Sequence, residues 1–159
     1  MIGAMIGLRH PTRVLGVLLL LCAGGVLAPA PARADGSVSQ LHMGMGARAG
    51  EMGLFDAVVA RYNASGERFR IDSHCQSACT IFLSIRNVCI APGASLLFHS
   101  GGDMKNNKVS VASTQHMLNA YNAALRQYVS ANHYMDTFTF HTISGSEIIS
   151  RFGYPACPK

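Results

Sequence analysis

The sequence CQSACT, residues 75–80, joins two segments whose hydrophobic residues follow different periods. Before it, RFRID (68–72) alternates apolar and polar residues with the period of two that is typical of a short strand. From its centre onward, ACTIFLSI (78–85) is an apolar run that suits a buried helix. The sequence therefore predicts an α/β fold in which Ser77 lies at a strand-to-helix turn.

His99 lies at a second junction of the same kind. It ends the apolar run LLFH (96–99), which follows the turn residues APGA (91–94), so we expect it to project from the end of a strand. A serine becomes nucleophilic when an adjacent base accepts its proton, and free N–H groups at a helix start stabilise an oxyanion. Each residue also has a purely structural interpretation, Ser77 as a helix N-cap and His99 as a hydrogen-bonded edge residue, and both stay open here.

Two segments resemble a known family. CQSACTIFL (75–83) and NVCIAPGASLLFH (87–99) resemble the nucleophile and histidine segments of the ClpP serine peptidases within the ClpP/crotonase superfamily. They are similar above all to those of small periplasmic relatives with a Cys-x-Ser-Ala-Cys-Thr signature. The resemblance covers roughly residues 44–157. It implies one small α/β domain built as a ClpP/crotonase-like repeated ββα/βα spiral, with Ser77 as nucleophile and His99 as general base.

The resemblance also implies two oxyanion donors. One is the N–H of Ala78, the residue after the nucleophile, and the other belongs to the glycine-bearing loop GMGARAG (44–50). The Gly-Gly pair usual in that loop is absent, so the second donor is Gly44, Gly46 or Gly50, and we take Gly46 as the candidate.

The family's third catalytic residue, an aspartate, has no direct counterpart in this chain. An ungapped match brings His141 near that position, and Asp136 reaches it only after a shift of several residues. Glu147 is better explained by a capping box with Ser144 at the start of the last helix. The resemblance thus implies a Ser-His dyad or an incomplete triad, without the acid that normally fixes the tautomer of the histidine.

Residues 1–34 have the pattern of a secretory signal peptide. Arg9 and Arg13 precede the apolar run 14–28, and ARA (32–34) supplies small residues at the cleavage position. Cleavage leaves residues 35–159 as one ClpP-like α/β domain, which we expect in the periplasm of a bacterium or outside the cell. The alternative is an uncleaved segment that contacts the membrane, although the apolar run is short for a span.

The mature domain carries little net charge. The chain has 13 Lys and Arg residues and 8 Asp and Glu residues, and three of the basic residues lie in the signal segment, so 10 minus 8 leaves +2. No basic cluster remains that would indicate a nucleic-acid partner.

Four cysteines remain in the mature domain, at positions 75, 79, 89 and 157. An even number in an exported chain predicts two disulfides, and the sequence does not choose among the three connectivities. Zinc bound by Cys75, Cys79 and His74 is the alternative use of the first pair. Otherwise we expect no metal and no cofactor.

The other patterns predict a strand over residues 37–43, a helix over 51–63 and a long helix over 113–131 that Ser113 caps. Met117, Tyr121 and Tyr128 share the apolar face of the long helix, as core or subunit-contact residues. Members of the superfamily commonly form trimers, hexamers or stacked rings. We therefore expect a homo-oligomer.

Two functions follow from these observations. The first is an exported serine hydrolase, either a peptidase or an acyl hydrolase, that acts on a peptide or acyl substrate. The second is a catalytically inactive ClpP-like module that binds a partner or serves as a scaffold in the periplasm.

Overall fold

The structure is a computed structural model and describes residues 35–41 and 52–159. The predicted signal peptide (1–34) and the loop with Gly44, Gly46 and Gly50 lie outside the described residues. Helices and strands alternate along the described chain in one small compact unit, so the mixed α/β class is confirmed. The elements are β1 (Gly36–Ser37), α1 (Val38–Leu41), α2 (Met52–Ser65), β2 (Phe69–Ile71), β3 (His74–Gln76), the 3-10 helix η1 (Ser77–Ser84), β4 (Val88–Ile90), β5 (Ser95–Phe98), β6 (Gly102–Asp103), β7 (Lys108–Val109), α3 (Val111–Asn119), α4 (Ala123–Ala131), β8 (His141–Ser144) and α5 (Gly145–Phe152).

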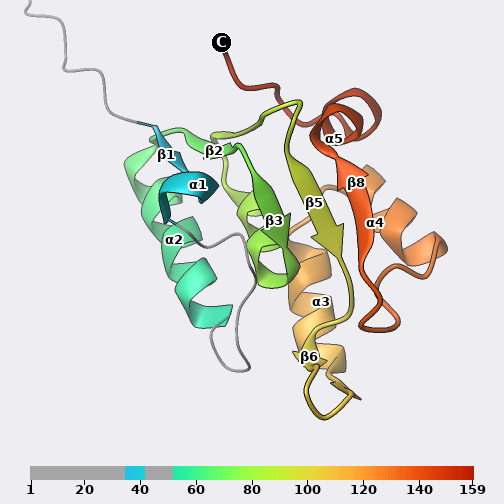
Figure 1. Ribbon diagram of the computed structural model, residues 1–159. Coiled ribbons are helices and arrows are strands. Elements are labelled where there is room, and N and C mark those ends of the chain that lie inside the picture. Colours follow the sequence, from blue (N-terminus) through green and yellow to red (C-terminus); the bar gives the residue numbers. More distant parts are fainter. Residues whose placement is uncertain (1–34, 42–51) are drawn as a thin grey trace, which may run out of the picture. The chain divides into compact units, whose positions relative to one another are not determined.

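Two three-stranded sheets and one hairpin form the β structure of the described residues (Figure 1). β1, β2 and β4 are parallel, with β2 in the middle. The second sheet has the order β3-β5-β8, in which β5 runs parallel to β3 and antiparallel to β8. β6 and β7 form a short antiparallel hairpin soon after β5. Because β3 and β5 are parallel, their carboxyl ends lie at the same edge of the sheet.

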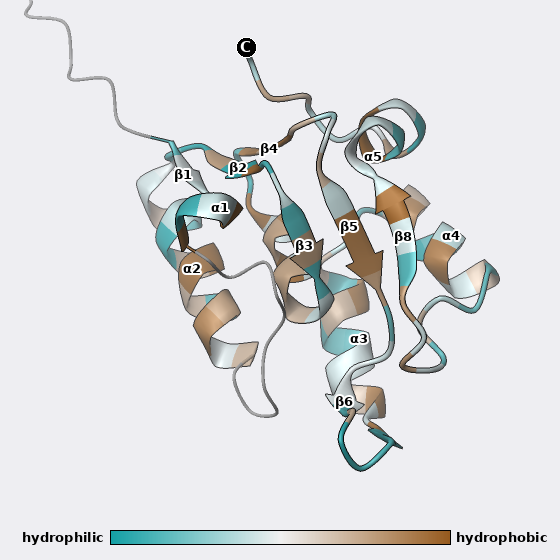
Figure 2. Ribbon diagram, in the orientation of Figure 1, coloured by the Kyte–Doolittle hydropathy of each residue, from teal (hydrophilic) through white to brown (hydrophobic). Residues whose placement is uncertain are grey.

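One hydrophobic core joins β2, η1, β5 and the helices. Phe69 and Ile71 of β2 are fully buried and the residue between them is not, as the alternation of residues 68–72 predicts. Edge-to-face ring contacts join Phe69 to Phe82 of η1, with ring centroids 4.8 Å apart, and Phe98 of β5 to Tyr121, at 5.4 Å. Figure 2 shows β5 as the hydrophobic strand of the second sheet.

The predicted strand over residues 37–43 is confirmed only at Ser37, because residues 38–41 form a helix, and residues 42–43 lie outside the described residues. β1 ends at Ser37, and helix α1 follows at once. The Ser37 hydroxyl accepts a hydrogen bond from the Gln40 N–H at 3.2 Å. The Asp72 carboxylate accepts from both the N–H and the hydroxyl of Ser39, at 3.0 and 2.6 Å. These side chains satisfy the first N–H groups of a helix as an N-cap does, so the chain leaves the sheet after two residues.

The predicted long helix over residues 113–131 is two helices. Ser110, not Ser113, caps α3, and Asn122 caps a separate helix, α4. The Asn122 N–H donates to the Tyr154 hydroxyl at 2.9 Å, which anchors the corner between the helices to the C-terminal segment. This break depends on a residue 32 positions away, so the local periodicity of the sequence does not report it.

Met117 and Tyr121 are core residues of this chain. Their side chains are 1 % and 2 % exposed, so they do not serve as subunit contacts. Tyr128 is half-buried. The expected homo-oligomer therefore stays a prediction that these residues no longer support.

Ser144 and Gly153 delimit α5 as the sequence predicts. The Ser144 hydroxyl accepts from the Glu147 N–H at 3.2 Å, and Gly153 ends the helix in the left-handed conformation with φ of 75°. The Glu147 carboxylate binds the Arg151 guanidinium at 2.9 Å. None of the helices in residues 35–41 and 52–159 is long and apolar enough to cross a bilayer.

The four cysteines form two disulfides, Cys75–Cys79 and Cys89–Cys157, so the predicted pairing of all four is confirmed. The first joins the middle residue of β3 to η1, and the second joins β4 to the C-terminal segment. Because Cys75 and Cys79 bind each other, they are not available as the thiolate ligands of the zinc alternative. Disulfides of this kind are typical of proteins from oxidising compartments.

Candidate active site

The strand register brings Ser77 and His99 to the same edge of the second sheet. Gln76, the last residue of β3, pairs with Leu97 of β5. Ser77 is therefore level with Phe98, and His99 is the next residue along the neighbouring strand. Paired strands lie about 4.8 Å apart. In α/β sheets, ligands bind outside the carboxyl ends of parallel strands, which is where these two residues lie.

Ser77 is the first residue of η1 and has an unusual backbone conformation. Its φ is +56°, in the left-handed region that residues other than glycine rarely adopt. Gln76 is the N-cap of η1, and no side chain caps the helix. The interpretation of Ser77 as an N-cap is therefore wrong. Ser77 does lie at a strand-to-helix turn, but the strand before it is β3, whereas the predicted strand over 68–72 is β2 of the other sheet.

Two features hold Ser77 in this conformation. The buried disulfide Cys75–Cys79 joins the residues two positions before and after it. The Thr80 hydroxyl donates to the Ser77 carbonyl oxygen at 2.7 Å. A backbone conformation of this kind persists only where surrounding contacts determine it. Such hydroxyl bonds to a carbonyl three residues earlier, together with the short disulfide, also account for a 3-10 helix in place of the expected α-helix.

His99 is buried in an aromatic environment. Its side chain is 3 % exposed, and the Phe140 ring lies edge-to-face against it with centroids 4.7 Å apart. Phe138 adds a second ring contact at 6.0 Å. Within the described part of the chain, neither ring nitrogen has a hydrogen-bond partner. The expected contact between His99 and Ser77 is therefore not a hydrogen bond in this structure, and the dyad stays a prediction.

Burial lowers the pKa of His99 below its ordinary value of 6.5. A lowered pKa keeps the imidazole neutral at neutral pH, which is the form that accepts a proton. The neighbouring Ser100 side chain is also fully buried, and its hydroxyl has no partner among the described residues. The site thus contains two adjacent buried polar side chains without hydrogen bonds.

The Phe140 ring lies beside His99, on the side of β8. β5 and β8 pair Phe98 with His141, so the next pair toward the site places Phe140 opposite His99. His141 itself stacks on Tyr134, with centroids 4.2 Å apart and planes at 9°. The ungapped match to His141 therefore provides no group that binds the His99 ring.

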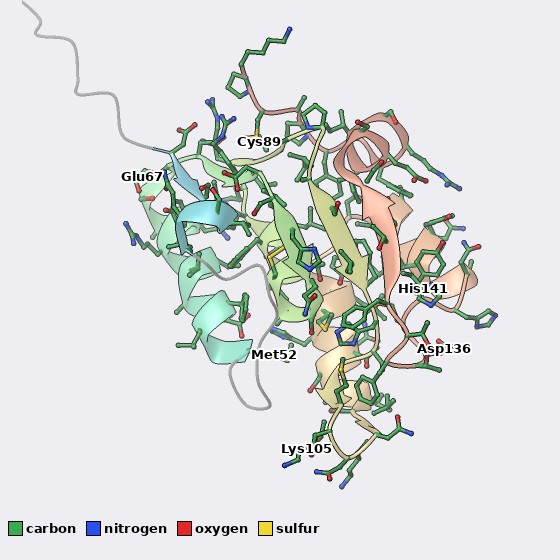
Figure 3. The ribbon with its side chains drawn as sticks, in the orientation of Figure 1. Met52, Glu67, Cys89, Lys105, Asp136 and His141 are labelled. Atoms are coloured by element: carbon green, nitrogen blue, oxygen red, sulfur yellow. A yellow bond between two sulfur atoms is a disulfide. The ribbon has the colours of Figure 1, made fainter. Side chains whose placement is uncertain are left out.

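The two acids considered from the sequence bind elsewhere. Asp136 lies in the loop before β8 (Figure 3), and its carboxylate binds the His133 Nδ1 at 2.8 Å. Glu147 binds Arg151. Both ion pairs are largely exposed to solvent. An imidazolium formed at His99 would therefore lack a carboxylate among its described neighbours, so no complete triad is present in this arrangement.

Ala78 is the second residue of η1, so its N–H is among the first groups of the helix that lack an intrahelical acceptor. This position agrees with its predicted role as an oxyanion donor. Gly46, the candidate for the second donor, lies outside the described residues. In the ranges 35–41 and 52–159, no three His, Cys, Asp or Glu side chains gather in the way that a metal site requires.

A cavity of about 300 Å³ lies next to the segment that leads to Phe138. The Ser100 N–H donates to the carbonyl oxygen of Thr137 at 2.8 Å, so a main-chain hydrogen bond joins this segment to the residue after His99. The volume is at the lower end of the range for small-molecule pockets, about 300–1,000 Å³. The lining residues are Val109, Val111, Thr114, Gln115, Met135 and Asp136.

Sequence reasoning missed Thr80, Tyr121, Phe138 and Phe140 as residues of the site. Sequence features that point to some of them were present: Thr80 belongs to the quoted CQSACT motif, and FTF (138–140) alternates like the strand that follows it.

Comparisons of the chain with protein families, curated proteins and solved structures found no match.

Proposed function

We propose that this protein is an exported serine hydrolase of the ClpP/crotonase type that cleaves a peptide or acyl bond. One observation supports this most. Ser77 is the first residue of the 3-10 helix η1, and its own backbone is in the left-handed region. It lies at the same edge of the sheet as His99, which follows the end of the neighbouring parallel strand β5. Strained residues of this kind cluster at active sites, because the surrounding structure must stabilise a conformation that the chain does not prefer. The two disulfides support the exported location.

The burial of His99 gives independent support. A buried polar group without a hydrogen bond costs about 1–3 kcal/mol of stability. An apolar residue would pack better between Phe138 and Phe140, since those rings offer the imidazole no hydrogen bond. A catalytic role is one explanation for such a group, and a general base of lowered pKa is an example of that role.

In the proposed reaction, the neutral His99 imidazole accepts the Ser77 hydroxyl proton while the Ser77 oxygen attacks the substrate carbonyl carbon. The carbonyl electron pair moves to oxygen, and the Ala78 N–H stabilises the resulting oxyanion, with Gly46 as the proposed second donor. The imidazolium then gives its proton to the leaving group, and water hydrolyses the acyl-serine by the same steps. Catalytic hydrogen bonds are often absent before substrate binds, so the free form need not join Ser77 to His99.

The missing acid sets the expected rate. Replacing the aspartate of a serine-protease triad lowers kcat by about 10⁴. A site in which Phe140, rather than an acid, lies beside His99 is therefore expected to react with an activated probe far more readily than it turns over a peptide. The assay should consequently follow covalent labelling of Ser77 rather than steady-state hydrolysis.

The second candidate is a catalytically inactive ClpP-like binding or scaffold module. The observation that favours it is the same aromatic contact: His99 is enclosed by Phe138 and Phe140 and has no acid partner. In this function, Ser77 and His99 would remain as structural parts of an inherited fold, and the cavity beside residues 135–136 would bind a partner rather than a substrate.

The repeated spiral and the homo-oligomer are parts of the same proposal. The parallel pairs within β1-β2-β4 and β3-β5 agree with such a spiral at the level of two small sheets. The oligomer rests on the resemblance; Leu54 and Val111 are apolar side chains that are 58 % and 82 % exposed. Contact with a second copy would remove this apolar surface from water.

A fluorophosphonate probe tests the hydrolase. The full chain, expressed with its own export segment, should be labelled at Ser77, while Ser77→Ala should not be labelled and His99→Gln should react at least tenfold more slowly, which is about 1.4 kcal/mol of barrier. Ser84→Ala is the matched control, because Ser84 lies in the same helix and donates to the Ile81 carbonyl instead. Its labelling should equal that of the unchanged protein.

Two results would count against Ser77 as the nucleophile, and the first of them favours the inactive module. The first is an absence of labelling in a protein that melts cooperatively. The second is labelling that persists unchanged in Ser77→Ala, which would place the reactive group elsewhere. Mass spectrometry of the labelled peptide identifies the modified residue in either case.

A further inference from the structure

Thr80 lies between the proposed nucleophile and a buried tyrosine. Its hydroxyl is 2.7 Å from the Ser77 carbonyl oxygen and 2.6 Å from the Tyr121 hydroxyl oxygen. The Thr80 side chain is 0 % exposed and that of Tyr121 is 2 % exposed, so water does not compete for these bonds. Both distances are typical of O–H···O hydrogen bonds.

The chemistry of the three groups fixes the direction of both bonds. A carbonyl oxygen only accepts, so the single hydrogen of Thr80 points to Ser77. The Tyr121 hydroxyl must then donate to the Thr80 oxygen. Burial raises the pKa of Tyr121, so this hydroxyl keeps its proton throughout the physiological pH range. The result is a chain of two donors, from Tyr121 to Thr80 to the Ser77 carbonyl, in which each bond polarises the next.

This chain of bonds controls the orientation of one peptide group. The carbonyl of Ser77 and the N–H of Ala78 belong to the same planar peptide and point in opposite directions. When the Thr80 hydroxyl holds the carbonyl toward the core, the Ala78 N–H must point away from the core. A rotated peptide would aim the carbonyl oxygen, rather than the N–H, at a developing oxyanion.

Tyr121 is itself held firmly. It lies at the corner between α3 and α4, and its ring packs edge-to-face on Phe98 at 5.4 Å. The next residue, Asn122, binds the Tyr154 hydroxyl through its N–H and the Phe152 carbonyl through its side chain, at 2.9 and 2.7 Å. The donor at the start of the hydrogen-bond chain is thus part of the packed core.

We propose that Thr80 and Tyr121 are positioning residues that lock the Ser77–Ala78 peptide with its N–H facing the site, as an oxyanion donor requires. This inference rests on the hydrolase function proposed above. In this role, the Tyr121 and Thr80 hydroxyls orient the Ala78 N–H, and neither residue contacts the substrate.

Three substitutions in the full chain test the inference. Thr80→Val removes the hydroxyl at nearly constant shape, Thr80→Ser keeps it, and Tyr121→Phe removes only the donor to Thr80. The rate of fluorophosphonate labelling at Ser77 should fall about tenfold to a hundredfold in Thr80→Val, since complete loss of an oxyanion donor costs about 10²–10³. Tyr121→Phe should fall less, about threefold to tenfold, because Thr80 still donates. Thr80→Ser should retain the rate within about twofold.

A second measurement separates positioning from folding. A boronic acid that adds to Ser77 forms a tetrahedral adduct, and the ¹H–¹⁵N resonance of Ala78 should shift strongly on binding in the unchanged protein and in Thr80→Ser. In Thr80→Val the shift should be lost while the melting curve remains cooperative. If Thr80→Val fails to fold, Tyr121→Phe serves as the test with the same readouts.

The outcomes distinguish the two proposals. Labelling of the unchanged protein together with an undiminished rate in folded Thr80→Val, or in folded Tyr121→Phe if Thr80→Val fails to fold, would overturn the positioning role and leave the hydrolase intact. No labelling of the unchanged protein would overturn the hydrolase, and the positioning role would fall with it. A reduced rate in Thr80→Val that Thr80→Ser restores, with the matching loss of the Ala78 shift, is the expected result.

Discussion

The two disulfides close loops of very different length, and we expect them to contribute unequally to stability. Cys89 and Cys157 are 68 residues apart, whereas Cys75 and Cys79 are four residues apart. A cross-link removes conformational entropy from the unfolded chain in proportion to the logarithm of loop length. At 25 °C this relation gives about 4 kcal/mol for the long loop and about 2 kcal/mol for the short one.

The perturbation should keep one bridge at a time. In Cys75→Ala/Cys79→Ala only the long bridge remains, and in Cys89→Ala/Cys157→Ala only the short one remains. Urea unfolding of each variant, with and without reductant, compares the same sequence in both states, so changes in packing from the substitutions cancel. Reduction should lower the unfolding free energy by about 4 kcal/mol in the first variant and about 2 kcal/mol in the second.

Removal of the short bridge should affect the rate of Ser77 labelling more than removal of the long bridge does, which is the reverse of their order for stability. The short bridge spans Ser77 and holds its left-handed backbone, so its removal should slow labelling while stability changes modestly. Removal of the long bridge, which joins β4 to the C-terminal segment, should leave the labelling rate of the folded protein unchanged. An equal loss of unfolding free energy on reduction of the two bridges would contradict this expectation.

Four further predictions concern His99, Ser100 and Asp136. His99→Phe should raise the unfolding free energy by about 1–3 kcal/mol in urea, because it removes two ring nitrogens without hydrogen bonds. The unfolding free energy of the unchanged protein should fall as the pH falls below 6.5. The reason is that His99 takes up a proton in the unfolded chain at a higher pH than in the native state, where its pKa is lowered. The unfolding free energy of His99→Phe should fall less over the same pH range. Ser100→Ala should be neutral or stabilising by about 1 kcal/mol in the same assay, because its hydroxyl is buried without a partner. Asp136→Asn should leave Ser77 labelling within about twofold, since the carboxylate binds His133; a loss of about tenfold would show that this acid turns to His99 during the reaction.

The parts of the fold that were predictable from sequence depend on local pattern. The alternation over 68–72 and the helical spacing over 51–63 correspond to β2 and α2, which are set by the burial of Phe69, Phe55 and Tyr62. The cap at Ser144 needs only its own neighbours. Local hydrogen bonds and periodic burial are properties of a short window, so a single sequence contains them.

The wrong predictions lie where contacts with residues distant in the sequence determine the local structure. Hydrogen bonds to the Asp72 side chain favour a helix over residues 38–41, and Tyr154 anchors the break at Asn122. In the site, Ser77 and His99 could be named from their junctions, but Phe138 and Phe140 come from the segment that leads into β8, the strand antiparallel to β5. Pairing between such segments is a property of the folded chain and is not visible in any one of them.

Three unfavourable features meet at one edge of the second sheet. Ser77 adopts a left-handed backbone, His99 is buried without a hydrogen bond, and the adjacent Ser100 hydroxyl is unpartnered. By contrast, Ser110 and Asn122 cap α3 and α4, and the buried hydroxyls of Thr80 and Tyr121 bind each other. A chain selected for stability alone would relax each of these features with a single substitution. Their presence together at the carboxyl ends of two parallel strands is therefore best explained by chemistry at that edge, which is the basis for testing Ser77 first.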